Sequence, residues 1–201
     1  MLLFAFYTVV VTLGILSMGF QLLASRLLGP YFGSAIDVWA CLISTFLAAF
    51  SVGAMLGGWI SNLPPAQRTR WQLGGAIVAV LTLALTAYRG RSLIDSIATE
   101  MDPGKLPIML SCVVVFFFPV MSLSSFTPQC VQFLASRGTP PGKASGLVYG
   151  VSTLGNIAGV MLTAFALIPH LAVSTLLYIW LAVAVVSLTA LLQLFRPNPA
   201  P

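Results

Sequence analysis

The sequence has few charged residues. Only 6% of its 201 residues are Asp, Glu, Lys or Arg, whereas soluble domains contain about 25%. The hydrophobic share is 59% and the mean hydropathy is +1.02. These values exclude an ordinary soluble domain. We predict an all-α polytopic membrane protein with about six transmembrane helices, organised as a single domain over residues 1–196 with a short tail at 197–201.

The sequence is also poor in the side chains that catalysis uses. It contains four acidic residues and one histidine, so general acid–base chemistry has few candidates. It has no Walker loop and no HExxH, GxSxG or Rossmann pattern, and His, Cys and carboxylate residues do not cluster at metal-ligand spacing. We therefore expect no enzyme activity, cofactor or metal site in this chain alone.

Cysteine is scarce as well. Cys41, Cys112 and Cys130 are odd in number, lie in or beside apolar runs and show no CxxC spacing. This pattern is unlike a disulfide framework or a zinc site. We interpret the three residues as small apolar packing groups.

The net charge of +5 comes mostly from short segments between apolar runs. Membrane lipid therefore explains it better than nucleic acid. Counting basic residues favours a cell-membrane protein with both termini in the cytoplasm, five inside against four outside. The inside group is Arg68, Arg70, Arg137, Lys143 and Arg196.

Glycine is abundant, and it is regularly spaced in residues 146–169. Gly146 and Gly150 are four apart, and Gly155 and Gly159 repeat that spacing one step later. Small residues at this spacing let helices approach closely in lipid, so we predict a packing groove here, and another at Gly53 and Gly57 in the second span. Asn156 lies in the first groove. Its amide either contacts a solute or partner, or makes an ordinary hydrogen bond between helices.

The first span is predicted over residues 2–28 and should end at Gly29-Pro30. Gln21 and Ser25 share a face, and Gln21 either lines a solute path or joins two helices. Arg26 can extend to the membrane interface. Asp37 begins the second span, where it either complements the helix dipole or is a counter-ion for Arg26 or for a cationic solute.

The later spans differ from one another in composition. A third span over residues 72–88 is followed by an amphipathic segment, 92–102, which is expected to form a separate helix on the membrane surface. Pro119 and Pro128 predict a kinked or broken fourth span, with nearby hydroxyl groups bonding the freed carbonyls. Broken helices often mark solute sites in transporters. A sixth span is predicted over residues 172–195.

Three ordered motifs resemble those of one membrane family. They are RLLGPYFGS-x3-VW, G-x3-GG and YG-x-STLGNIAG-x7-LIP. Together they are similar to the membrane domain of spermidine-synthase-like proteins, which is fused to a major-facilitator-like half. The matching positions are Arg26, Pro30, Gly33, Trp39, Gly57, Gly58, Asn156, Gly159 and Pro169.

The chain departs from this family in three places. The family's first span carries a glutamate where this chain has Gln21, and an aspartate follows the GG pair where this chain has Asn62. The aminopropyltransferase domain is missing. The resemblance thus implies a six-helix unit similar to half of a major facilitator, and it does not transfer spermidine synthesis.

These observations leave three functional hypotheses. The leading one is a membrane module that binds or transports a small solute, such as a polyamine or another cation. It would act as a homo-oligomer or within a larger membrane complex. Its substrate-binding residues would be Gln21, Arg26, Asp37, Trp39 and Asn156. The alternatives are a structural subunit that anchors a separate protein, and a membrane enzyme that recruits a soluble transferase in trans.

Overall fold

The structure is a computed structural model that describes residues 2–195. It is 89% helical, and the described residues contain no strand. Six helices are long and apolar enough to cross a bilayer, which confirms the predicted all-α polytopic fold. The predicted tail, and Arg196 from the charge count, lie outside the described residues.

Four of the six spans are single unbroken α-helices. Their bounds are α1 Leu2–Phe32, α2 Ile36–Ser61, α3 Pro65–Glu100 and α8 Val173–Phe195. The other two spans each contain a π-helical turn. The fourth span comprises α4 Lys105–Cys112, η1 Val113–Phe117, α5 Phe118–Ser124 and α6 Phe126–Ala135, and the fifth comprises α7 Pro141–Met161 and η2 Leu162–Leu167.

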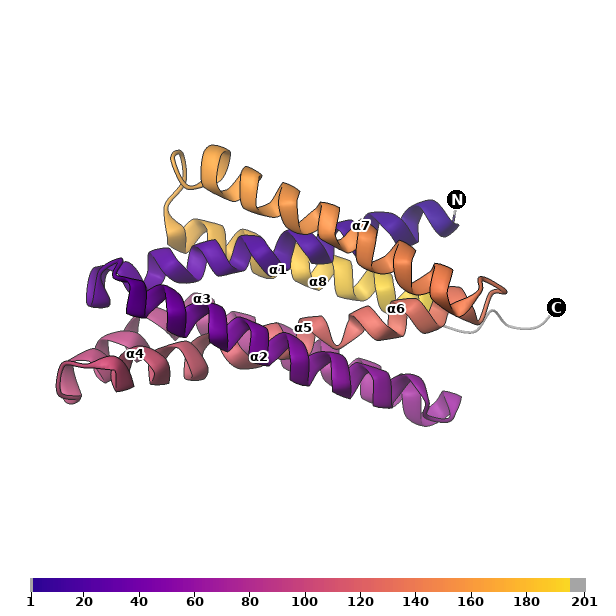
Figure 1. The fold of residues 1–201 in the computed structure, drawn as a ribbon, viewed down its shortest axis with the longest axis horizontal. Helices are drawn as coiled ribbons and strands as arrows, with labels where there is room; N and C mark the ends of the chain where they lie inside the picture. The colour runs from indigo at the N-terminus through magenta and orange to yellow at the C-terminus, as the bar shows by residue number, and fades with distance from the viewer. Residues whose placement is uncertain (1, 196–201) are drawn as a thin grey trace.

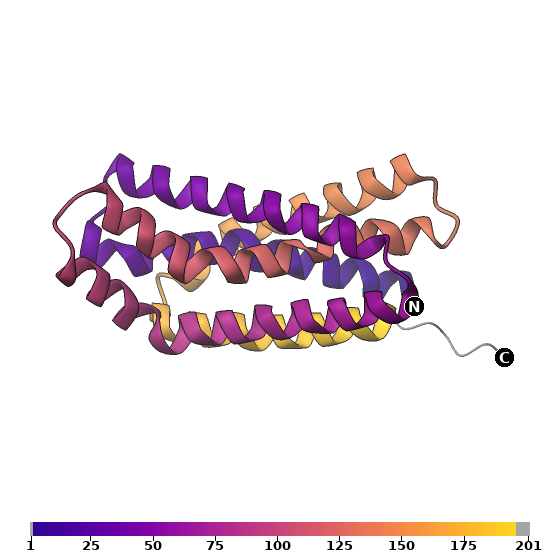
Figure 2. The same ribbon diagram turned by 90° about the horizontal axis from the view of Figure 1, so that it is seen from below.

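The spans form an elongated bundle in which α1 is central. α7 and α2 lie on opposite sides of α1 (Figure 1). The view from below shows α3 beside α8 (Figure 2). The α2–α3 and α6–α7 connections lie at the same end as the beginning of α1 and the end of α8. We call this the terminal end, and the other the opposite end.

The core is built from large apolar side chains of α1, α2 and the fourth span. Phe20, Phe46 and Phe116 are each at most 1% exposed, and their ring centroids lie 5.8–6.4 Å apart. Aromatic rings at this separation pack favourably at offset or edge-on angles. The cluster therefore fixes η1 against α1 and α2.

Two predicted boundaries were wrong. The first span does not end at Gly29-Pro30, because α1 continues to Phe32 and the chain turns at Gly33, whose φ is +71°. A proline in the last turn removes only the hydrogen bond to the carbonyl four residues earlier, here that of Arg26. Arg26 is exposed near the membrane boundary, where water or head groups can replace that bond.

The predicted surface helix over residues 92–102 is not separate, because α3 runs unbroken from Pro65 to Glu100. Its 36 residues correspond to about 54 Å at 1.5 Å per residue, well beyond the hydrocarbon thickness of about 30 Å. The apolar face of the extension packs on protein, since Ile94 is 0% exposed. Gly90 alone does not end the helix, because a single glycine costs only about 1 kcal/mol.

The fourth span is broken, as predicted. It changes to a π-helical turn at Val113–Phe117, and Ser125 separates α5 from α6 while its backbone angles stay close to helical (φ −62°, ψ −21°). Pro119 has no amide hydrogen for the carbonyl of Val115, four residues earlier. The Thr86 hydroxyl on α3 donates to that carbonyl at 2.8 Å. A neighbouring helix therefore completes the hydrogen bonding that the proline removes.

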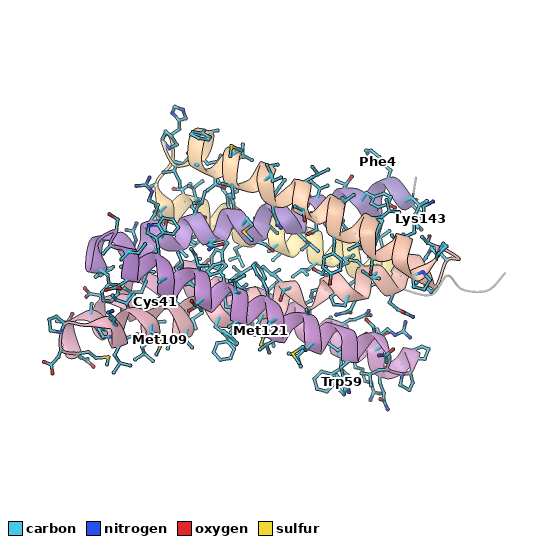
Figure 3. The ribbon with its side chains drawn as sticks, in the orientation of Figure 1. Phe4, Cys41, Trp59, Met109, Met121 and Lys143 are labelled. Atoms are coloured by element: carbon cyan, nitrogen blue, oxygen red, sulfur yellow. The ribbon has the colours of Figure 1, made fainter. Side chains whose placement is uncertain are left out.

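Two exposed aromatic pairs indicate the membrane boundaries. At the terminal end, Trp59 and Trp71 have ring centroids 5.2 Å apart, and Trp59 projects outward from α2 (Figure 3). At the opposite end, Tyr88 and Tyr178 are 5.1 Å apart. Trp and Tyr concentrate at membrane–water interfaces. Along α3, Trp71 and Tyr88 are separated by about 26 Å of helix rise, close to the bilayer's hydrocarbon thickness.

Candidate functional site

A cavity of about 220 Å³ lies midway along the bundle. We call it the central cavity. It is bounded by α1, α2, α7 and the junction of α5 with α6, where the fourth span is interrupted. Its lining residues are Ser17, Met18, Phe50, Ala54, Ser124, Thr127, Tyr149, Ser152, Thr153 and Asn156.

One wall of the central cavity depends on backbone contact between α1 and α7. A Cβ atom at Gly155 would overlap the carbonyl oxygen of Val11, and one at Gly159 would lie 2.5 Å from that of Ile15. From the other side, a Cβ atom at Gly14 would overlap the carbonyl oxygen of Ser152. These glycines therefore let two backbones touch, which brings Asn156 beside α1.

The opposite wall depends on glycines in α2. A Cβ atom at Gly53 would overlap the Met121 carbonyl oxygen, and one at Gly57 would overlap that of Ser125. Met121 lies beside α2 near the middle of the bundle (Figure 3). This part of the fourth span thus packs closely against α2, and the Ser124 hydroxyl lies 3.0 Å from the Met121 carbonyl of its own helix and 3.3 Å from the Ala49 carbonyl of α2.

The central cavity carries no charge, and its lining combines hydroxyl and amide groups with a larger apolar surface. Five of its lining residues bear hydroxyl groups on Ser or Thr, and no lining residue is Asp, Glu, Lys, Arg or His. The Oδ1 atom of Asn156 is buried and accepts no hydrogen bond within the described residues. An unpaired acceptor at this depth is costly.

The predicted solute-binding residues do not all meet at this cavity. Asn156 lines it, whereas Arg26 and Trp39 line a second cavity of about 500 Å³ at the opposite end, bounded by α1, α2 and η2. We call that space the Arg26 cavity. Gln21 lines neither of these two cavities. It lies one helical turn from Ser17 of the central cavity and one turn from Ser25 of the Arg26 cavity, on the same face of α1.

Asp37 has a different partner from the one considered. Its carboxylate lies 3.5 Å from the ammonium group of Lys105, so it pairs with the start of α4 and not with Arg26. Asp37 lies in the first turn of α2, where a carboxylate also complements the helix dipole. It lines neither the central nor the Arg26 cavity.

The predicted glycine groove of the fifth span is divided between two faces. Gly155 and Gly159 pack against α1, but Gly146 and Gly150 are exposed, and a Cβ atom added at either would have no neighbouring atom within 4 Å. The reason is geometric. The step from Gly150 to Gly155 is five residues, which turns the helix face by about 140° at 3.6 residues per turn. The groove therefore does not continue past Gly150.

Sequence reasoning missed several lining residues. Tyr149, Ser152 and Thr153 lie on the fifth span, where the sequence pattern had pointed only to glycines and Asn156. Their spacing offers a signal, because Tyr149, Ser152, Thr153 and Asn156 recur at three or four residues and so share one face of a helix. The Ser124 and Thr127 hydroxyls were expected to bond freed carbonyls, and both also line the central cavity.

No protein-family model matches the chain, and no curated protein or solved structure matches it. The class that the fold defines is a multi-pass, all-α membrane protein.

Proposed function

We propose that this chain is a membrane module that binds or transports a small polar solute at the central cavity. The observation that carries the proposal is the placement of Asn156. Asn156 lines an uncharged cavity with several hydroxyl groups where α5 gives way to α6, and its Oδ1 acceptor is buried without a partner among the described residues. Interrupted helices at the bilayer midplane form the solute sites of many secondary transporters.

The chemistry of the cavity favours a solute that donates hydrogen bonds. Amide and hydroxyl oxygens accept from N–H and O–H groups. Small amines are therefore the class we propose, including polyamine-like cations, for which these oxygens replace water. A volume of about 220 Å³ is below the range of about 300–1,000 Å³ for drug-sized ligands, which favours a small molecule.

The polar face of α1 supplies a route from this cavity. Ser17 lines the central cavity and Ser25 lines the Arg26 cavity. Gln21 lies between them on the same face. We propose that these three side chains provide successive hydrogen-bonding positions between the middle of the membrane and its opposite end.

We further propose that the module is a dimer. The central cavity opens between α2 and α7, and the neighbouring surface of α7 presents Gly146, Tyr149, Gly150 and Thr153. Small and polar side chains of this kind are typical of helix–helix interfaces in membranes. A second copy covering this surface would enclose the cavity, as the second half of a major facilitator does in the family that the sequence resembles.

The orientation follows from the charges. All four acidic residues of the chain lie at the opposite end, namely Asp37, Asp95, Glu100 and Asp102. The described charges at the terminal end are all basic, namely Arg68, Arg70, Arg137 and Lys143. By the positive-inside bias, we propose that the terminal end faces the cytoplasm of a cell membrane.

The proposal is tested by replacing Asn156. In proteoliposomes, binding or uptake of labelled small amines such as putrescine and spermidine should fall by at least about tenfold in Asn156→Leu, the effect of losing one good hydrogen bond to a charged group. Gln21→Leu should slow uptake. The matched control is Asn62→Leu, because Asn62 is exposed and bonds only the Gly58 carbonyl of its own helix. Unchanged uptake in folded Asn156→Leu would refute the assignment.

A structural membrane subunit is the second candidate, and the exposed glycine face of α7 is the observation that favours it. Gly142, Gly146 and Gly150 lie in open space along one side of α7. Such a face fits the backbone of a helix from another protein. This candidate predicts a stable complex with a different polypeptide after mild extraction, and no saturable amine binding. A soluble transferase recruited in trans would be one such polypeptide.

A further inference from the structure

A third cavity, separate from the proposed solute route, lies at the terminal end. Its volume is about 250 Å³. We call it the Arg68 cavity. It lies between the start of α3, the end of α6 and the last residue of α8, and its polar lining includes Arg68, Gln72, Gln129, Gln132, Ser136 and Arg137.

Both arginines in this cavity lack an acidic partner among the described residues. The Arg68 guanidinium donates to the Leu63 carbonyl at 3.4 and 3.2 Å. The Arg137 guanidinium lies 3.6 Å from the centre of the Phe133 ring and donates to the Phe133 carbonyl at 3.5 Å. A guanidinium has five N–H donors. Most donors of both groups therefore remain free.

Buried amides complete the lining. Gln72 is 5% exposed and Gln129 is 3% exposed. The Gln129 amide nitrogen donates to the Ser125 carbonyl at 2.9 Å, whereas its Oε1 atom is buried without a hydrogen-bond partner. The cavity thus offers two cationic groups, and an unpaired acceptor is buried in its wall. This combination fits an oxyanion that carries a proton or a nearby hydroxyl group.

The charge distribution concentrates positive potential at this cavity. No acidic residue of the chain lies at the terminal end, since all four are at the opposite end. Pro65 begins α3 beside the cavity, so the positive end of a 36-residue helix points there as well. An anion is therefore attracted by two side chains, by the helix and by the whole end of the bundle.

Tryptophans typical of the membrane interface lie close in sequence to the cavity lining. Trp59 and Trp71 mark the membrane boundary at this end and are close in sequence to Ser61 and Gln72 of the cavity lining. Basic pockets between helices at a positively charged membrane face are typical binding places for anionic head groups.

We propose that the Arg68 cavity binds a phosphate group, with Arg68 and Arg137 as its cationic donors and Gln129 accepting from a protonated oxygen or hydroxyl of the same ligand. The phosphate belongs either to an acidic phospholipid or to a soluble phosphate ester. This site does not depend on the solute role proposed for the central cavity, because the two cavities share no lining residue.

The test measures lipid retention by native mass spectrometry of the purified full chain. Phosphatidylglycerol should bind at least about tenfold more weakly to the double variant Arg68→Gln with Arg137→Gln, because each loses charge-assisted hydrogen bonds. The matched control is Arg70→Gln with Lys143→Gln. It removes the same charge from the same end, but neither residue lines the cavity. Because salt screens exposed charges, the affinity of this control for phosphatidylglycerol should stay within about twofold of that of the unaltered chain.

A second arm identifies the source of the phosphate. Inorganic phosphate is added at millimolar concentration and its effect on thermal unfolding is measured. If it stabilises the unaltered chain but not the Arg68/Arg137 variant, the site accepts soluble phosphate. If only phosphatidylglycerol discriminates between these proteins, the ligand is a lipid.

Three results would overturn the proposal. The first is an equal loss of phosphatidylglycerol affinity in the two double variants. The second is no loss of affinity in either of them, and the third is no binding of either probe to the unaltered chain. Should the Arg68/Arg137 variant fail to fold, the single variants Arg68→Gln and Arg137→Gln replace it, and each should still bind phosphatidylglycerol more weakly than Arg70→Gln does.

Discussion

The fourth and fifth spans both contain a π-helical turn, yet the protein surrounds them very differently. The fourth span is Lys105–Ala135, and 56% of the residues in its apolar 18-residue window are buried. The fifth span is Pro141–Leu167, and the corresponding share is 17%. The fourth span is interrupted inside the bundle. The fifth is smooth through α7, is rich in glycine, and packs mainly on α1 and α6.

This difference shows two ways of making polar space inside a membrane protein. In the fourth span, proline frees backbone carbonyls, and hydroxyl groups on neighbouring helices can bond them, as Thr86 does for Val115. In the fifth span, glycines remove side-chain volume, and polar side chains of the unbroken helix α7 line the space. The central cavity lies where the two arrangements meet, with Ser124 and Thr127 on one side and Asn156 on the other.

Breaking the glycine contacts should have the largest effect. Gly57→Leu places a side chain against the Ser125 backbone, and Gly155→Leu places one against that of Val11. Overpacking typically costs about 1–3 kcal/mol, and backbone cannot move aside as a side chain can, so we expect about 3 kcal/mol or more in each case. Thermal unfolding in detergent and the yield of monodisperse protein measure it.

Each of these variants has a matched control on its own helix. Gly58 and Gly150 have no atom within 4 Å of an added Cβ. Gly58→Leu and Gly150→Leu should therefore leave the free energy of unfolding of the single chain within about 1 kcal/mol of its original value. Comparable losses at Gly58 and Gly57 would contradict the close approach of α2 to the fourth span.

A double-mutant cycle tests whether Thr86 replaces the backbone hydrogen bond that Pro119 removes. Thr86→Val removes the hydroxyl that bonds the Val115 carbonyl and should cost about 1–2 kcal/mol, because a buried acceptor loses its partner. Pro119→Ala restores an amide that can bond the same carbonyl. In the Pro119→Ala background, Thr86→Val should therefore cost less, and the coupling should be at least about 0.5 kcal/mol. Additive losses would show that Thr86 acts independently of the proline.

The fifth span should respond with the opposite sign. Thr163 in η2 is 0% exposed, and its hydroxyl has no hydrogen-bond partner within the described residues. Thr163→Val keeps the shape and removes an unsatisfied polar group, so we expect a stability gain of up to about 1 kcal/mol. Chemical unfolding of Thr163→Val beside Thr86→Val gives the comparison directly. A loss of stability in both variants would mean that the Thr163 hydroxyl has a hydrogen-bond partner.

The sequence predicts the gross architecture well, because hydropathy and length alone decide which segments cross a bilayer. The interruption of the fourth span was also predictable, since Pro119 chemically prevents a regular helix. The end of α1 and the length of α3 were not. Both depend on whether neighbouring helices support a weak breaker such as Pro30 or Gly90, and tertiary packing decides that.

The candidate site was predictable only in part. Asn156 stands out in the sequence because an amide is costly in the membrane wherever it lies. The sequence does not show how deep in the membrane Gln21, Arg26 and Trp39 lie relative to Asn156. Their depth is set by the arrangement of α1, α2 and η2 in the fold. The Arg68 cavity was not anticipated at all, because its two arginines are 69 positions apart in the sequence and line the same cavity only once the start of α3 and the end of α6 are placed in the fold.

The smallest expected effect comes from the exposed glycines of α7. Gly146→Ala and Gly150→Ala add one methyl group each in open space and improve helix propensity, so the single chain should gain no more than about 1 kcal/mol from each. If a second helix uses this face, the same methyl groups separate two backbones and the dimer dissociates more readily. Analytical ultracentrifugation in detergent separates the cases. A shift toward monomer, with thermal unfolding unchanged, assigns the face to assembly, whereas an unchanged distribution leaves the central cavity open to lipid and removes the support for a dimer.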